Sequence, residues 1–107
     1  MPCLDLSDIL QKCKQILQTH YQSRFRGLIL YGSLARQEAV HASDIDLLVL
    51  LDGPIDYFQE LWTIVGLLYP VQLESERLIS AKPVLLEEFE QGRIQLYRQA
   101  KREGVRL

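Results

Sequence analysis

This sequence contains little cysteine or histidine and has no marked excess of either charge. Each of these features excludes a class of protein. The 107 residues include two cysteines and two histidines. Two cysteines in a charged chain indicate reduced thiols rather than a disulfide framework. The histidines are far apart and have no cysteine at zinc-binding spacing, which argues against a structural zinc site. Lys and Arg number 12 against 14 Asp and Glu, a net charge of -2. Long nucleic acid needs a clustered basic excess, so we do not expect it as a partner.

Long hydrophobic runs and the common nucleotide-binding and hydrolase motifs are also missing. The longest apolar runs, such as Leu47–Leu51, are far shorter than a membrane span. There is no G-x-x-x-x-G-K-[ST], G-x-G-x-x-G or G-x-S-x-G sequence. No signal peptide is visible, because Asp5 follows the first Met closely. We therefore expect one cytoplasmic domain over residues 1–107, without membrane contact, since this length suits one domain.

The first half of the chain predicts one helix and two strands. Apolar residues at helical spacing predict a helix over 6–21, with Asp5 as its N-cap and Cys13 on its apolar face. A short buried strand is predicted at 28–31, and a helical turn at 34–39. The nearly continuous apolar run at 45–51 is typical of a strand in the centre of a sheet.

The second half predicts a helix that follows Asp56 and ends at Pro70. A strand over 78–85 is expected at a sheet edge, because Pro83 cannot donate to a ladder. Helices at 86–91 and 94–103 are each followed by a glycine. This order of elements is an α+β layout in which helices pack against one small mixed sheet.

Four aromatic residues stand at helical spacing and are predicted to belong to the core rather than to stack on a base. They are Tyr57, Phe58, Trp62 and Tyr97.

Two short motifs carry the chemistry. Asp44 and Asp46 are two residues apart at the start of the central strand, so both point to the same face. Each carboxylate raises the pKa of the other unless a cation lies between them, and oxygen ligands of this kind favour Mg²⁺ bound to substrate phosphates. Upstream, Gly32 allows a phosphate to approach the backbone, and Ser33 begins a turn whose N–H groups can hold an anion. A Gly-Ser turn or an Asp-x-Asp pair alone is more often structural, but together, each beside a strand, they indicate phosphoryl or nucleotidyl transfer.

The spacing of these motifs resembles the signature of the DNA polymerase β-type nucleotidyltransferases, in the branch of minimal nucleotidyltransferase (MNT) domains. That signature is Gly-Ser, ten residues and Asp-x-Asp, which matches Gly32-Ser33 followed by Asp44-Ile45-Asp46. The resemblance covers nearly the whole chain and implies a polymerase β palm-like fold.

The resemblance also implies a reaction and roles for residues. Such enzymes move a nucleoside monophosphate from a nucleoside triphosphate, here ATP by expectation, to an acceptor hydroxyl. Gly32 and Ser33 would hold the triphosphate, and Asp44 and Asp46 would be catalytic residues that ligate Mg²⁺. Arg36 occupies the arginine of the family's Gly-Ser-x-Ala-Arg-Gly pattern and would approach phosphate, unless it only caps a helical turn. Gln37 replaces the final glycine of that pattern.

The sequence departs from the family at the third carboxylate, which active members supply from a following strand. If that strand begins at Val71, Glu74 is the candidate for this catalytic position. If the strand runs through residues 78–80, the position is Ser80 and the ligand is missing. Glu76 is a further alternative, and both glutamates also suit a solvated edge.

Two functions follow from the resemblance. The first is an Mg²⁺-dependent enzyme that attaches AMP to a partner protein, with a HEPN-type toxin as the implied acceptor and the protein itself as antitoxin. The second is a binding module that has lost catalysis and neutralises its partner by forming a stoichiometric complex. Self-association is also expected for so small a core.

Overall fold

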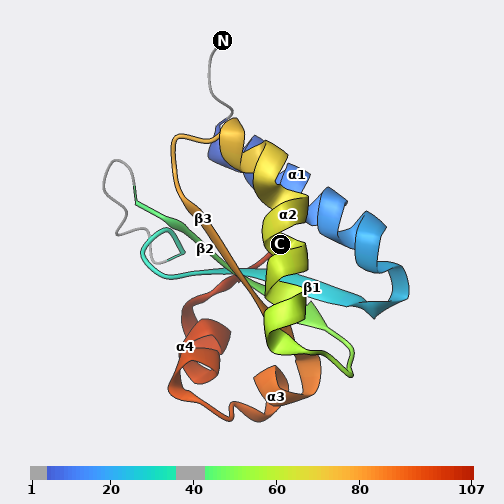
Figure 1. Ribbon diagram of the computed structural model, residues 1–107. Helices are drawn as coiled ribbons and strands as arrows, with labels where there is room; N and C mark the ends of the chain where they lie inside the picture. Colours follow the sequence, from blue (N-terminus) through green and yellow to red (C-terminus); the bar gives the residue numbers. More distant parts are fainter. Residues whose placement is uncertain (1–4, 36–42) are drawn as a thin grey trace.

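The structure is a computed structural model, and it describes residues 5–35 and 43–107 (Figure 1). Its sheet has four strands in the order β3-β2-β1-β4. The strands are β1 (Phe25–Tyr31), β2 (Ile45–Leu51), β3 (Ile79–Leu85) and β4 (Val105–Arg106). The helices are α1 (Leu6–Tyr21), α2 (Tyr57–Leu73), α3 (Leu86–Gln91) and α4 (Gln95–Glu103), with a 3₁₀ turn over Gln22–Arg24. The predicted α+β fold class is confirmed.

Strand β2 lies in the middle of the sheet, as its apolar sequence predicts. It pairs antiparallel with β1 and parallel with β3. Parallel strands need a crossover connection, and α2 supplies it. Strand β3 lies at the sheet edge, which agrees with the position expected from Pro83. Strand β4 was not predicted, because two residues carry no pattern of alternation; it forms by pairing with β1.

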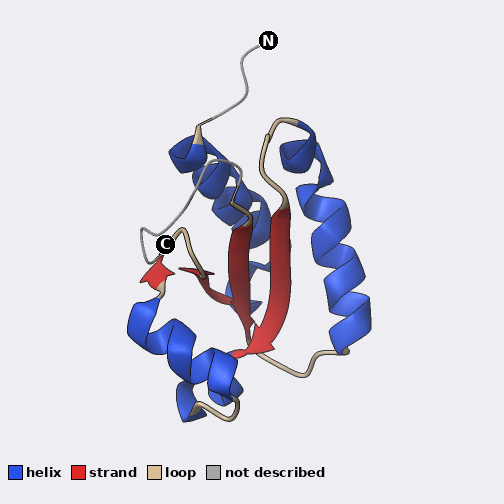
Figure 2. Cartoon of the chain, turned by 90° about the vertical axis from the view of Figure 1, so that its left-hand side faces the viewer, coloured by secondary structure: helices blue, strands red, loops and turns tan. Residues whose placement is uncertain are grey.

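Helices α1 and α2 cover one face of the sheet, and their apolar residues form the larger core. Figure 2 shows these two long helices packed against the strands. The Asp5 carboxylate accepts a hydrogen bond from the Asp8 N–H at 2.9 Å, so the predicted N-cap is confirmed. Cys13 is fully buried, and burial raises the pKa of its thiol to about 11. The sheet residues of this core are Leu28, Leu30, Ile45, Leu47, Val49, Leu51 and Ala81.

Helices α3 and α4 cover only part of the opposite face. The second core there includes Ile29, Leu48, Leu50, Val84, Phe89 and Ala100, with Tyr31 and Tyr97 at its margin. Tyr97 packs on Phe89 with ring centroids 6.3 Å apart, in keeping with its expected place in the core. The second core reaches Leu48 but not Asp46, which stays partly exposed. The face around the start of β2 is therefore open.

The predicted end of the second helix is wrong, since α2 continues through Pro70 to Leu73. A proline ring clashes with the carbonyl four residues earlier and removes one hydrogen bond. Here that earlier residue is Gly66, and both positions are exposed, so water can solvate the free carbonyl. Val71, only 2% exposed, anchors the last turn in the core.

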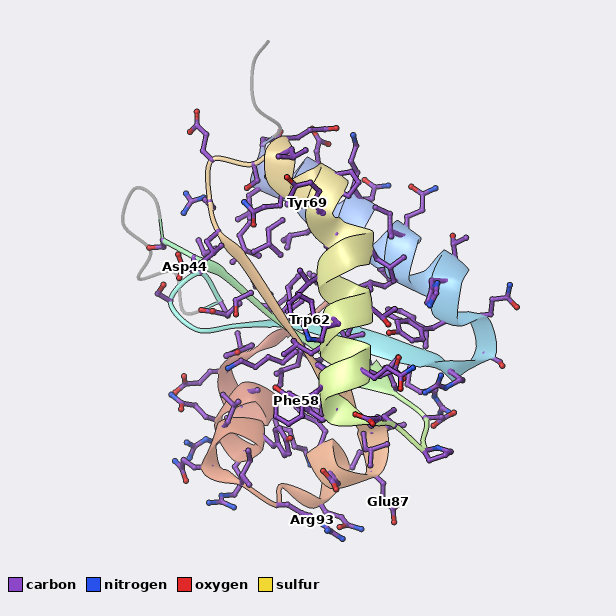
Figure 3. The ribbon with its side chains drawn as sticks, in the orientation of Figure 1. Asp44, Phe58, Trp62, Tyr69, Glu87 and Arg93 are labelled. Carbon is purple, nitrogen blue, oxygen red and sulfur yellow. The ribbon has the colours of Figure 1, made fainter. Side chains whose placement is uncertain are left out.

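The predicted burial of the aromatic residues on α2 is also wrong. Phe58 is 71% exposed, Trp62 75% and Tyr57 40%. The buried side of α2 carries Ile64, Leu68 and Val71 instead. Apolar residues occupy two sides of this helix, and periodicity alone does not say which side meets the sheet. Figure 3 labels Phe58, Trp62 and Tyr69 along α2.

Candidate active site

The Gly-Ser turn and the Asp-x-Asp pair meet at one end of the sheet. Gly32 follows β1, and Asp46 is the second residue of β2. Because the two strands are antiparallel, the end of β1 lies beside the start of β2, and Tyr31 pairs with Asp46. Gly32 has φ +77°, and a Cβ added to it would lie 2.5 Å from Oδ2 of Asp46. The position therefore needs glycine for its backbone conformation and for the carboxylate that contacts it.

The two carboxylates lie close enough to interact. Asp44 is exposed, just before β2, and Asp46 is partly buried. Desolvation raises the pKa of Asp46, the negative charge of Asp44 raises it further, and the positive charge of Lys82 opposes both effects. A cation between the two carboxylates would relieve this repulsion.

The backbone around Asp44 is held by the segment that leads into β3. Nη1 of Arg77 donates a hydrogen bond to the Ser43 carbonyl at 2.9 Å. The Ile45 N–H donates to the Leu78 carbonyl at 2.8 Å. The Gln72 side chain in turn accepts from the Ile79 N–H at 2.7 Å and donates to the Arg77 carbonyl at 3.0 Å. The sequence alone did not predict Arg77 or Gln72 as supports of the site, because they act through contacts that only the fold creates.

The strand beside Asp46 offers a serine and a lysine instead of a third carboxylate. In the parallel pairing, Ser80 lies opposite Asp46, and Lys82 lies opposite Leu48. Both side chains share a face with Asp46, because residues two apart in a strand point the same way. Lys82 is partly buried, and within the described residues its ammonium makes no hydrogen bond or ion pair. The sequence alone did not predict Lys82 as a site residue, since its proximity to Asp46 depends on the β2–β3 register.

Glu74 does not lie on the strand beside Asp46. The alternative of a third strand from Val71 is wrong, because that segment belongs to α2. Glu74 follows the helix, and its carboxylate forms an ion pair with Lys12 of α1 at 3.1 Å. Glu76 is exposed in the loop before β3. The catalytic role of Glu74 stays a prediction, and Ser80 takes the strand position next to Asp46. Among the residues that the structure describes, no group of three or more His, Cys, Asp and Glu side chains is placed to hold a metal.

The remaining predicted nucleotide-binding residues are Ser33 and Arg36. Ser33 lies in the turn after β1 and is partly exposed. Arg36 and most of the predicted helical turn over 34–39 lie outside the described residues; Leu34 and Ala35 are in a turn. The phosphate-binding roles of Gly32, Ser33 and Arg36 stay predictions.

A hollow of about 170 Å³ adjoins Gly32 between the end of β1 and α4. Its lining residues are Tyr31, Gly32, Leu96, Gln99, Ala100 and Glu103. Burial raises the pKa of Tyr31 to about 12, with smaller contributions from Asp46 and Tyr57. The Tyr31 phenol therefore stays protonated at neutral pH and can donate a hydrogen bond beside the carboxylates.

A family model described as "Polymerase beta, Nucleotidyltransferase" matches residues 11–107. The chain belongs to this family. The matched range contains Gly32-Ser33 and Asp44-Ile45-Asp46, and the structure brings these two segments together at one end of the sheet.

Several known proteins are similar to this family member. The protein MJ0604 of Methanocaldococcus jannaschii, named as a protein adenylyltransferase, is 39% identical over 70 residues, which are 62% of this chain and 70% of MJ0604. MJ1217 of the same organism, named likewise, is 34% identical over 71 residues, 66% of this chain and 60% of its own length. A third such protein, MJ0128, is matched over 54% of its length.

Two solved structures share the fold. Spectinomycin adenyltransferase AAD(9) of Enterococcus faecialis, solved with ATP and spectinomycin, gives a TM-score of 0.72 at 19% identity. The match covers 96% of this chain and 56% of that enzyme. A chain of the MntA–HpeT toxin–antitoxin structure gives a TM-score of 0.59 at 18% identity and covers 97% and 72% of the two chains. These likenesses establish the nucleotidyltransferase fold.

Membrane-spanning helices are absent from the part of the chain that the structure describes, since none of its helices has the length and apolar character to cross a bilayer.

Proposed function

We propose that this member of the nucleotidyltransferase family binds Mg²⁺-ATP and transfers AMP to a hydroxyl group of a partner protein. The observation that carries the proposal is the contact between Gly32 and Asp46, because it joins the phosphate-binding turn to the carboxylate pair. The names of the Methanocaldococcus jannaschii relatives support AMP as the transferred group and a protein as the acceptor.

Asp44 and Asp46 suit a divalent cation, since both are oxygen donors whose negative charges repel each other. When bound, Mg²⁺ would supply charge neutralisation for the triphosphate oxygens. The backbone of Gly32 and Ser33 would hold the phosphates, and the Lys82 ammonium would attract them from the β3 side. In the transfer, the acceptor oxygen bonds to the α-phosphorus as the bond to pyrophosphate breaks, and the acceptor hydroxyl loses its proton.

A base must accept the proton of the acceptor hydroxyl. The residues beside Asp46 favour slow transfer of AMP, because they do not offer a strong base. Ser80, opposite Asp46, is a poor base at neutral pH, whereas the third carboxylate of active family members would stand at such a position. This observation supports the second candidate function, in which the protein binds nucleotide and neutralises a partner stoichiometrically. The likeness to a chain of the MntA–HpeT toxin–antitoxin structure supports a role in a toxin–antitoxin pair in either case. A HEPN-type toxin, which the resemblance of the sequence implies, is the partner that we propose.

Calorimetric titration of ATP, with and without Mg²⁺, tests the donor site. We expect Mg²⁺-dependent binding to the wild type and at least ~10-fold weaker binding to Asp46→Ala, since two carboxylates share the cation. Glu87→Ala serves as the control, because Glu87 is an exposed carboxylate on α3. No binding at millimolar ATP contradicts the proposal.

Transfer is tested separately with α-labelled ATP and the proteins that co-purify with this one. Label on a partner supports the enzyme, and we expect the double variant Asp44→Asn, Asp46→Asn to abolish it. If the double variant still neutralises the partner fully and the wild type transfers no label, the binding module is the correct function.

A further inference from the structure

Helix α2 presents an apolar stripe that the fold does not bury. It consists of Phe58, Trp62, Val65, Tyr69 and Leu73, which are 71%, 75%, 50%, 57% and 68% exposed. We call this set the α2 stripe. Its members are separated by four, three, four and four residues, so they lie along one side of the helix. This spacing is the one by which helices pack against each other.

The α2 stripe is also uncharged. Glu60 is the only charged residue between Tyr57 and Leu73, and its carboxylate is bonded to Tyr21 and Arg24. A neutral stripe has no electrostatic preference for an oppositely charged partner. Two copies of a chain with net charge -2 would meet with least repulsion at such a surface.

We propose that the α2 stripe is the interface of a homodimer, in which two α2 helices pack antiparallel about a two-fold axis between Val65 and Gly66. The proposal is independent of nucleotide binding and transfer. A second copy of this chain is the partner that covers the α2 stripe.

The spacing of the stripe is symmetric about that axis. Antiparallel pairing there brings Phe58 opposite Leu73 of the second copy, and Trp62 opposite Tyr69 of the second copy. A two-fold interface requires such reciprocal pairs, because each surface is its own partner. At Gly66, an added Cβ would meet nothing within 4 Å, so this position leaves room for close approach of the helices.

A groove beside the α2 stripe can receive the exposed Trp62 side chain of a second copy. A hollow of about 270 Å³ lies between α2 and the start of β3, and its lining includes Val65, Tyr69 and the 58% exposed Leu78. In the antiparallel arrangement, Trp62 faces Tyr69 of the second copy and therefore reaches that copy's groove. The same surface thus carries both a projecting side chain and a cavity that suits it.

The exposed area is of the size that a stable dimer needs. At about 200 Å² for each fully exposed aromatic side chain, Phe58, Trp62 and Tyr69 together expose roughly 400 Å². A standard interface buries about 800 Å² on each partner. The three aromatic residues supply about half of that area, and Val65, Leu73 and Leu78 add to it.

Sedimentation equilibrium and tryptophan fluorescence test the dimer. We expect a mass of twice 12.4 kDa for the wild type at about 200 µM and dissociation on dilution. Trp62 is the only tryptophan, so its emission should shift to longer wavelength as the dimer dissociates. Trp62→Ala should raise the dissociation constant at least about 30-fold, as for a central interface aromatic. A mass of 12.4 kDa at every concentration overturns the proposal.

The antiparallel register is tested with cysteine variants on a Cys3→Ser background, where Cys13 is buried. A mixture of Phe58→Cys and Leu73→Cys should form a disulfide between copies on mild oxidation, whereas either variant alone should not. Gln59→Cys mixed with Leu73→Cys is the matched control, because Gln59 is exposed but lies outside the stripe. Cross-linking of Phe58→Cys with itself would indicate a parallel pair and would overturn the proposed register. Circular dichroism of each variant confirms that it is folded.

Discussion

Replacement of Gly32 by alanine should damage both the stability of the protein and its nucleotide site. Gly32 has φ +77°, a conformation that costs an alanine about 1–2 kcal/mol. The new Cβ would also lie 2.5 Å from Oδ2 of Asp46, so either the carboxylate or the turn must move. Together we expect a loss of about 2 kcal/mol in the free energy of unfolding, or roughly 8–16 °C in Tm for a domain of this size.

Gly66→Ala is the matched control for this substitution. Gly66 lies inside α2, where a Cβ would meet nothing within 4 Å, and alanine is the better helix former. Urea denaturation of dilute protein, at which the proposed dimer is dissociated, should therefore show a gain of about 0.5–1 kcal/mol for Gly66→Ala, opposite in sign to the loss for Gly32→Ala.

The same two variants separate the site from the fold. Calorimetry at a temperature where both are folded should show Mg²⁺-ATP binding weakened about 10-fold or more by Gly32→Ala, because the carboxylate is displaced. Gly66→Ala should bind as the wild type does. If Gly32→Ala keeps wild-type stability and affinity, then the contact between the turn and Asp46 does not hold the site together.

Three further predictions concern the carboxylate face. The folded-state pKa of Asp46 is raised above its unfolded value, so its ionisation costs stability as pH rises through the folded pKa. The urea midpoint of unfolding should therefore be higher for Asp46→Asn than for the metal-free wild type at pH 7, and the difference should disappear near pH 3. A lower midpoint for Asp46→Asn at pH 7 would contradict this prediction. Lys82→Ala should weaken Mg²⁺-ATP binding, and Lys82→Arg should restore it, as measured by calorimetry. An unchanged affinity of Lys82→Ala for ATP would show that Lys82 does not contact the phosphates. Ser80→Asp puts a carboxylate opposite Asp46 and should raise transfer from α-labelled ATP, while Glu74→Gln should leave it unchanged. A loss of transfer in Glu74→Gln would instead identify Glu74 as the third carboxylate.

The sequence alone determined the elements whose signal is local. The run at 45–51 predicts β2 because a strand buried on both faces is apolar throughout. The Asp5 cap and Gly92, at φ +63°, mark helix ends by their own chemistry. The spacing of Gly32 and Asp46 likewise indicated the family, because a signature of this kind is written in residue identities and intervals.

The tertiary structure decided what depends on neighbours distant in the chain. The contact of Gly32 with Asp46 and the place of Ser80 opposite Asp46 follow from strand register, which local periodicity does not specify. Helix α2 has two apolar sides, and only packing against the sheet buries Ile64 and leaves Trp62 exposed. Pro70 could lie within a helix because Val71 is anchored in the core. Local patterns therefore fixed most of the helices and strands, whereas long-range packing formed β4, carried α2 through Pro70 and fixed which side chains meet.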